Sequence, residues 1–98
     1  MDDTSVRDEQ VLELRVNGKS FAGIAKTLGF GRPYEANDAF NRALRRKPPA
    51  ERDTLRSSEL TRLDALADSV RANLEMAPDD IARRLRTLDR MRARLLAD

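Results

Sequence analysis

Apolar residues in the first half of the chain recur at helical spacing and predict three short helices. Val11, Leu12 and Leu14, with Val6 and, as a further candidate, Val16, are expected to supply the buried side of a first helix over residues 6–16. Phe21, Ile24 and Leu28 mark one apolar face of a second helix over residues 21–28. A third helix is predicted from Arg32 or Pro33 to Arg46, and its apolar positions fall on one side: Ala36, Ala39, Phe40, Ala43 and Leu44.

The first helix has a start signal and a stop signal. Ser5 and Asp8 have the spacing of a capping box, which predicts a start near Val6. Asn17-Gly18 predicts its end. The carboxylates of this helix are expected to face water: Asp8, Glu9 and Glu13.

The next two helices are delimited more sharply. Ser20 is placed to cap the second helix, and Gly29 to end it in the left-handed conformation. Pro33 can open the third helix because its missing N–H is not needed in the first turn. Two short helices joined by a turn of a few residues that contains Gly form the helix-turn-helix pattern.

The second half of the chain predicts two longer amphipathic helices. Pro48-Pro49 stops the third helix, because the residue before a proline avoids the helical region. A fourth helix over residues 50–74 and a fifth, ending at Leu96, are separated by the break at Ala77-Pro78. The fold class is therefore all-α. A tri-helical helix-turn-helix unit over residues 1–47 is followed by an antiparallel two-helix hairpin over residues 48–98.

The two long helices each have a single apolar stripe, which leaves three arrangements open. They can cover each other, dock on the N-terminal unit, or pair across a dimer interface. The fifth helix also carries six arginines: Arg83, Arg84, Arg86, Arg90, Arg92 and Arg94. They are interpreted either as a solvated face whose stems cover apolar surface, which is favoured, or as a second basic surface for nucleic acid or an acidic partner.

The amino-acid composition excludes several kinds of catalytic and metal-binding site. The chain has no Cys and no His, so thiolate and imidazole catalysis and most zinc sites are excluded. No Gly-rich phosphate loop is recognisable. We therefore expect no enzyme, no cofactor and no small-molecule substrate. The absence of a long apolar run and the acidic start MDDTSVRDEQ lead us to expect a cytoplasmic protein without membrane contact.

The distribution of charge favours DNA as a partner, although the net charge is only +2. Residues 31–47 hold five basic and two acidic groups. The predicted polar side of the third helix combines residue types that read base edges with two carboxylates that repel phosphates: Tyr34, Glu35, Asn37, Asp38, Asn41, Arg42 and Arg45. Arg45, Arg46 and Lys47 are better placed for phosphates. The alternative is a solvated face of an ordinary three-helix domain.

Residues 16–30, VNGKSFAGIAKTLGF, carry a resemblance. They look like the core of homeodomain-like helix-turn-helix proteins, in which a Gly-x-Ser start is followed by an aromatic residue, Ile-Ala and Leu-Gly. The second half, with residues 59–64 and 92–96, is similar to small phage-related helix-turn-helix proteins, some of which resemble terminase small subunits. The link before the last helix, Ala77-Pro78-Asp79, departs from the Gly-Asp turn of that pattern.

The resemblance implies sequence-directed binding of double-stranded DNA through the third helix. It aligns one set of residues with the part of the motif that approaches bases: Arg32, Tyr34, Asn37, Asn41 and Arg42. Lys19 and Ser20 align with the start of the second helix, which contacts the DNA backbone. The implied protein is a transcriptional regulator or a phage-type DNA-recognition subunit, nucleoid-associated and homo-oligomeric, with a dimer as the first expectation. The rival hypotheses are a helical protein–protein interaction module without DNA binding and a structural oligomer built by the hairpin.

Overall fold

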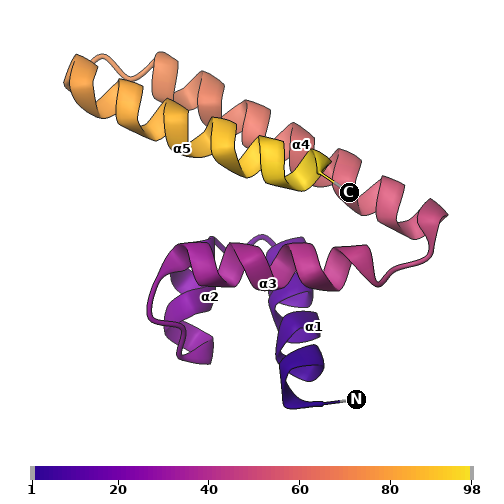
Figure 1. The fold of residues 1–98 in the computed structure, drawn as a ribbon. Helices are drawn as coiled ribbons and strands as arrows, with labels where there is room; N and C mark the ends of the chain where they lie inside the picture. The colour runs from indigo at the N-terminus through magenta and orange to yellow at the C-terminus, as the bar shows by residue number, and fades with distance from the viewer. Residues whose placement is uncertain (1, 98) are drawn as a thin grey trace. The chain divides into compact units, whose positions relative to one another are not determined.

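A computed structural model describes residues 2–97, and in this range the chain is all-helical, with five helices and no strand (Figure 1). The helices are α1 (Asp3–Val16), α2 (Phe21–Leu28), α3 (Pro33–Arg45), α4 (Pro49–Arg71) and α5 (Pro78–Leu96). The chain divides into two compact units between Pro49 and Ala50. The predicted boundary, after Lys47, lies two residues earlier.

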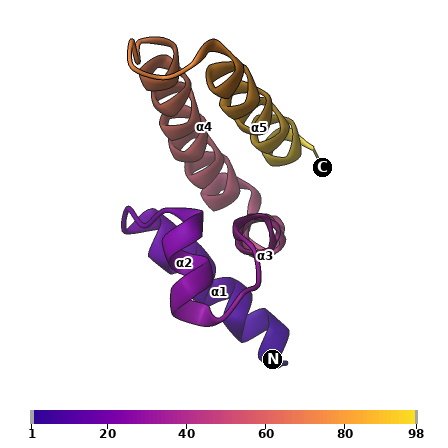
Figure 2. The same ribbon diagram turned by 90° about the vertical axis from the view of Figure 1, so that its left-hand side faces the viewer.

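The N-terminal unit is a bundle of three helices in which each helix contacts the other two (Figure 2). The predicted apolar side of α3 is confirmed, because all five of its members are buried: Ala36, Ala39, Phe40, Ala43 and Leu44. The small alanine side chains let α1 and α2 approach the α3 backbone closely. Val11 and Leu12 from α1 and Ile24 from α2 also belong to the core. The expected burial of Val6 and Val16 is wrong, because both are exposed near the two ends of α1, beyond the reach of the core.

Local signals set both ends of α2 as predicted. The Ser20 hydroxyl accepts a hydrogen bond from the Gly23 N–H at 3.1 Å. Gly29 caps the other end with φ +78°, a left-handed conformation that costs little without a Cβ. Gly18, which follows the C-cap of α1, has φ +98° and allows the chain to turn into α2. Pro33 occupies the first turn of α3, as expected.

The predicted start of α1 is wrong. The helix begins at Asp3, and its N-cap is Asp2, whose carboxylate accepts the Ser5 N–H at 2.7 Å. This hydrogen bond lowers the pKa of Asp2, since it stabilises the ionised form. Ser5 therefore lies inside the first turn, and the Ser5–Asp8 pair does not form the expected capping box.

We expect acid to fray the first turn of α1. A carboxyl group whose pKa is lower in the folded state contributes stability above its unfolded pKa and loses it as the pH falls through the folded pKa. The protection factor of the Ser5 amide, which compares its exchange rate with that of an unfolded chain at the same pH, should therefore fall toward low pH. In Asp2→Asn, which keeps an acceptor oxygen but does not titrate, the protection of Ser5 should not vary with pH over that range. Equal acid sensitivity in both proteins would contradict this assignment.

In the second unit, α4 and α5 lie side by side and run antiparallel, which confirms the hairpin (Figures 1 and 2). Leu63 and Leu95 are its buried apolar residues, and an ion pair between Asp64 and Arg92 joins the two helices. The predicted extension of α4 to Leu74 is wrong: the helix ends at Arg71, and Leu74 is 98% exposed in the connection.

Candidate nucleic-acid interface

An acidic residue of α1 fixes the basic end of α3. Asp8, only 1% exposed, accepts two hydrogen bonds from Arg42, from Nε to Oδ2 and from Nη2 to Oδ1, each at 3.0 Å. Arg46 reaches the same carboxylate, with Nη1 3.1 Å from Oδ2. The expectation that Asp8 faces water is therefore wrong. The helical spacing places Asp8 on the same side of α1 as the core residues Val11 and Leu12.

One further contact extends this row of ion pairs, which we call the ionic seam. Lys47 Nζ, just after α3, lies 2.8 Å from Glu9 Oε2 of α1, at a site where both side chains are partly buried. The hydrogen bonds that Arg42 donates to Asp8 raise the pKa of Arg42, an effect that its partial burial opposes. Three of the predicted DNA contacts, Arg42, Arg46 and Lys47, thus bind carboxylates of the same unit. Their positive charge is partly neutralised before any partner arrives.

Both arginines of α1, Arg7 and Arg15, bind the ends of α2. The Arg7 guanidinium lies 3.8 Å from the Phe30 ring centre and donates to the Leu28 carbonyl at 2.9 Å, at the C-terminus of α2. The Arg15 guanidinium lies 4.0 Å from the Phe21 ring centre and donates to the Lys19 carbonyl at 3.2 Å. Both combine a cation–π contact with a backbone hydrogen bond. We call Arg7 and Arg15 together the arginine clamp on α2. Residue type and spacing in the sequence do not predict it.

The polar side of α3 is less exposed than its sequence indicates. Asn37 and Asn41 are 6% and 5% exposed, and Asn41 Nδ2 donates to the Asn37 carbonyl at 3.2 Å, within the helix. Neither amide is presented at the surface. The interpretation of these two residues as solvent-facing base readers is therefore wrong for this structure.

The remaining predicted contacts are exposed. Lys19 and Ser20 precede α2, Arg32 and Tyr34 lie at the start of α3, and Arg45 lies in its last turn. Ser20 already uses its hydroxyl to cap α2. Among residues 2–97 we find no carboxylate partner for Lys19, Arg32 or Arg45. These three cations are therefore available to an external anion.

The start of α3 favours an anion beside these cations through its helix dipole. Arg32 is the N-cap of α3, and its side chain makes no capping hydrogen bond. Pro33 has no N–H, and the Glu35 N–H donates to the Arg32 carbonyl at 3.1 Å, so the dipole contributes more here than unpaired donors do. Glu35 in the same turn is partly exposed and supplies the nearest opposing charge. Asp38, one turn further along, is partly exposed and lies close enough to Arg42 to contribute to its raised pKa.

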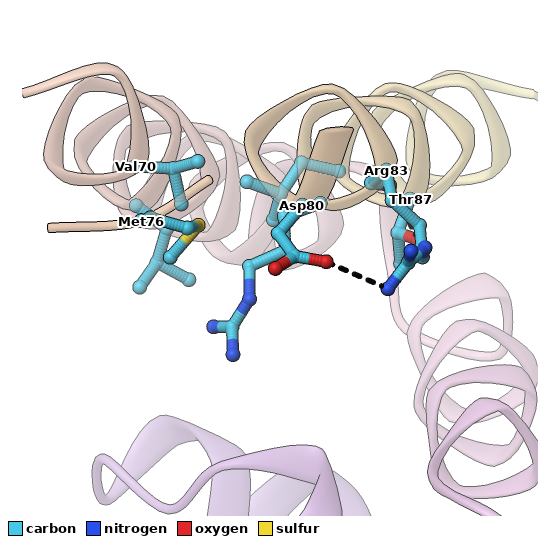
Figure 3. A pocket seen from close by; sticks show the side chains of 8 residues that line it. Val70, Met76, Asp80, Arg83 and Thr87 are labelled. Atoms are coloured by element: carbon cyan, nitrogen blue, oxygen red, sulfur yellow. Dashed lines mark hydrogen bonds and ion pairs between the residues drawn. The ribbon is translucent and has the colours of Figure 1, made fainter. Parts of the chain in front are cut away.

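The hairpin has its own concave feature, an open groove of about 590 Å³ between α4 and α5 (Figure 3). Its apolar lining is Leu66, Val70, Met76 and Leu88. Asp80 and Arg83, which form an ion pair at 3.0 Å, lie at its α5 edge. Within residues 2–97, no cluster of acidic side chains has the form of a metal site, and no helix is long and apolar enough to cross a bilayer.

Comparison with family models, with curated proteins and with solved structures gives no match to this chain. Any assignment of function therefore depends on the geometry and charge of the site itself.

Proposed function

We propose that this chain binds double-stranded DNA through a helix-turn-helix formed by α2 and α3, as a transcriptional regulator or a phage-type DNA-recognition subunit rather than an enzyme. The local architecture supports this. α2 ends at Leu28, α3 begins at Pro33, and the intervening turn contains two glycines, Gly29 and Gly31. α1 supports both helices from the side of the core. This is the order and turn length of a helix-turn-helix unit.

One observation carries the proposal: unpaired cations gather at the helix ends that such a unit presents to DNA. Lys19 precedes α2, and Arg32 precedes α3, whose first N–H groups lack a side-chain cap. In helix-turn-helix proteins the N-terminal residues of the second helix of the motif meet base edges in the major groove. Arg32 and Tyr34 occupy that position here. Arg45, in the last turn of α3, is suited to a phosphate.

We expect the wild-type protein to bind a labelled duplex of arbitrary sequence, and we expect its affinity to fall steeply as the salt concentration rises. Each phosphate contact contributes about 0.9 to the slope of log K against log salt concentration, because binding releases counterions. Arg45→Ala should therefore lower the slope by about 0.9. Fluorescence anisotropy at several salt concentrations measures this slope.

Lys26→Ala is the matched control. Lys26 is exposed in the last turn of α2, so its removal changes the charge of the same unit without touching α3 or the start of α2. It should leave the slope unchanged. No binding by the wild-type protein at low salt would refute the proposal. An equal loss of slope in Lys26→Ala and Arg45→Ala would show a general charge effect instead.

A protein-interaction module is the second candidate, and the ionic seam favours it. Arg42, Arg46 and Lys47 are held by Asp8 and Glu9, which reduces the charge available for phosphates. Tyr34 is 59% exposed, and exposed tyrosines are frequent anchors of protein interfaces. This candidate predicts no salt-sensitive affinity for DNA.

Because a single small unit buries a limited area on DNA, the DNA-binding proposal also predicts a homo-oligomer, which sedimentation can test.

A further inference from the structure

One side of α5 carries a row of arginines that begins at the edge of the groove and that we call the arginine ridge: Arg83, Arg86, Arg90 and Arg94. Their spacing of three, four and four residues places them along one side of the helix. All four are exposed. Leu88 and Leu95 lie on the opposite side of α5, where Leu88 lines the groove shared with α4 and Leu95 is buried.

Within residues 2–97, the middle of the ridge forms no ion pair, although Asp89 follows Arg86 by three residues on the same helix. Arg83 pairs with Asp80 at the start of α5, and Arg92, which is not part of the ridge, pairs with Asp64 of α4. In the described part of the chain, Arg86 has no ion-pair partner, and Arg90 donates only to the Thr87 hydroxyl, at 3.2 Å. Arg86 and Arg90 therefore present two adjacent, un-neutralised guanidinium groups to solvent.

This arrangement is unfavourable for an isolated helix. Like charges four residues apart repel each other, and the repulsion destabilises the helix that carries them. Arg86, Arg90 and Arg94 repeat that spacing twice. Arg83 lines the groove beside Leu88, but Arg86 and Arg90 are not among its lining residues, so covering that apolar surface does not explain Arg86 and Arg90. An external polyanion would remove the repulsion.

We infer that the arginine ridge is a second DNA-contacting surface that binds the phosphate backbone without reading sequence; this inference rests on the proposed function. Guanidinium groups match phosphate oxygens in geometry and charge. The ridge spans twelve residues, 83–94, or about 16 Å of helix. Its centre, Arg86 and Arg90, is four residues or about 6 Å long, so the two guanidinium groups can contact phosphates along one DNA strand.

The test compares two double variants of the full-length protein with the same change in charge. Arg86→Gln/Arg90→Gln removes the centre of the ridge, and glutamine keeps a long stem and a good helix propensity. Arg52→Gln/Arg71→Gln removes two arginines from α4 as the matched control. Circular dichroism confirms that the helix content of each variant equals that of the wild type. The probe is the labelled duplex of arbitrary sequence, titrated at salt concentrations from about 50 to 200 mM.

We expect the ridge variant to lower the slope of log K against log salt concentration by about 1.8. Raising the salt fourfold should therefore weaken DNA binding by the variant about tenfold less than it weakens binding by the wild-type protein. The α4 variant should keep the wild-type slope. A wild-type slope in the ridge variant, with a reduced slope in Arg45→Ala, overturns the ridge and leaves the proposed function standing. Equal reductions in both double variants also overturn it. If the wild-type protein does not bind the duplex, the proposed function fails and the ridge fails with it.

Discussion

Asp8→Ala should lower the free energy of unfolding of the N-terminal unit by about 2–3 kcal/mol. The substitution removes a buried carboxylate that accepts hydrogen bonds from Arg42 and ion-pairs with Arg46, so both arginines lose their partner at the α1–α3 interface. Their side chains are 40% and 42% exposed, so water can replace part of the lost interaction. The cost therefore falls below that of a fully buried ion pair.

Urea denaturation followed by tyrosine fluorescence measures this loss. Tyr34 is the single tyrosine of the chain and the chain has no tryptophan, so the signal comes from α3. Glu9→Gln is the control, because it breaks the neighbouring but more exposed pair with Lys47 and should cost about 0.5 kcal/mol. If Asp8→Ala costs no more than Glu9→Gln, the buried carboxylate does not hold α3 to α1.

Phe21→Ala should be the most damaging single substitution in this unit, with a loss of about 3–4 kcal/mol. The Phe21 ring is buried and makes an edge-to-face contact with Phe40, with centroids 5.8 Å apart and planes at 70°. Its face also receives the Arg15 guanidinium. Truncation therefore leaves a cavity between α2 and α3 and removes the aromatic platform on which α1 holds the start of α2.

The same denaturation experiment separates these effects. Phe21→Leu retains most of the apolar volume and should cost about 1–2 kcal/mol, the share due to ring geometry. Leu74→Ala removes an aliphatic side chain that is 98% exposed, and it should change the stability by less than about 0.5 kcal/mol. A loss below 1 kcal/mol in Phe21→Ala would contradict the packing described here.

The middle of the N-terminal unit could be predicted because local signals there agree. Ser20 and Gly29 bracket an apolar stripe of helical period, and the structure confirms both ends of α2. The start of α1 was harder, because Asp2 and Ser5 are both good caps three residues apart. Asp8, the second member of the expected capping box, instead accepts hydrogen bonds from Arg42, 34 residues further along the chain. A capping rule considers only neighbouring residues, so it cannot predict a contact between residues that far apart in the chain.

The candidate site was predicted only in part, for a related reason. The polarity of Asn37 and Asn41 predicts that they are exposed, but polarity does not determine exposure at the edge of an apolar face. In the same way, Leu74 continues the apolar spacing of α4, which predicts a helix up to that residue. Asn73 instead accepts the Glu75 N–H at 3.0 Å, a local turn that competes with the helix.

The arginine clamp on α2 has a consequence for the order of events during synthesis. α2 has eight residues, and a helix of that length is not stable alone in water. Its two ends are held by Arg7 and Arg15, which both belong to α1. Since α1 leaves the ribosome first, the template for α2 already exists when α2 emerges. One of the two helices that pack on α2 has thus already been synthesised, whereas the other, α3, which contacts Phe21 through Phe40, follows α2 in the chain.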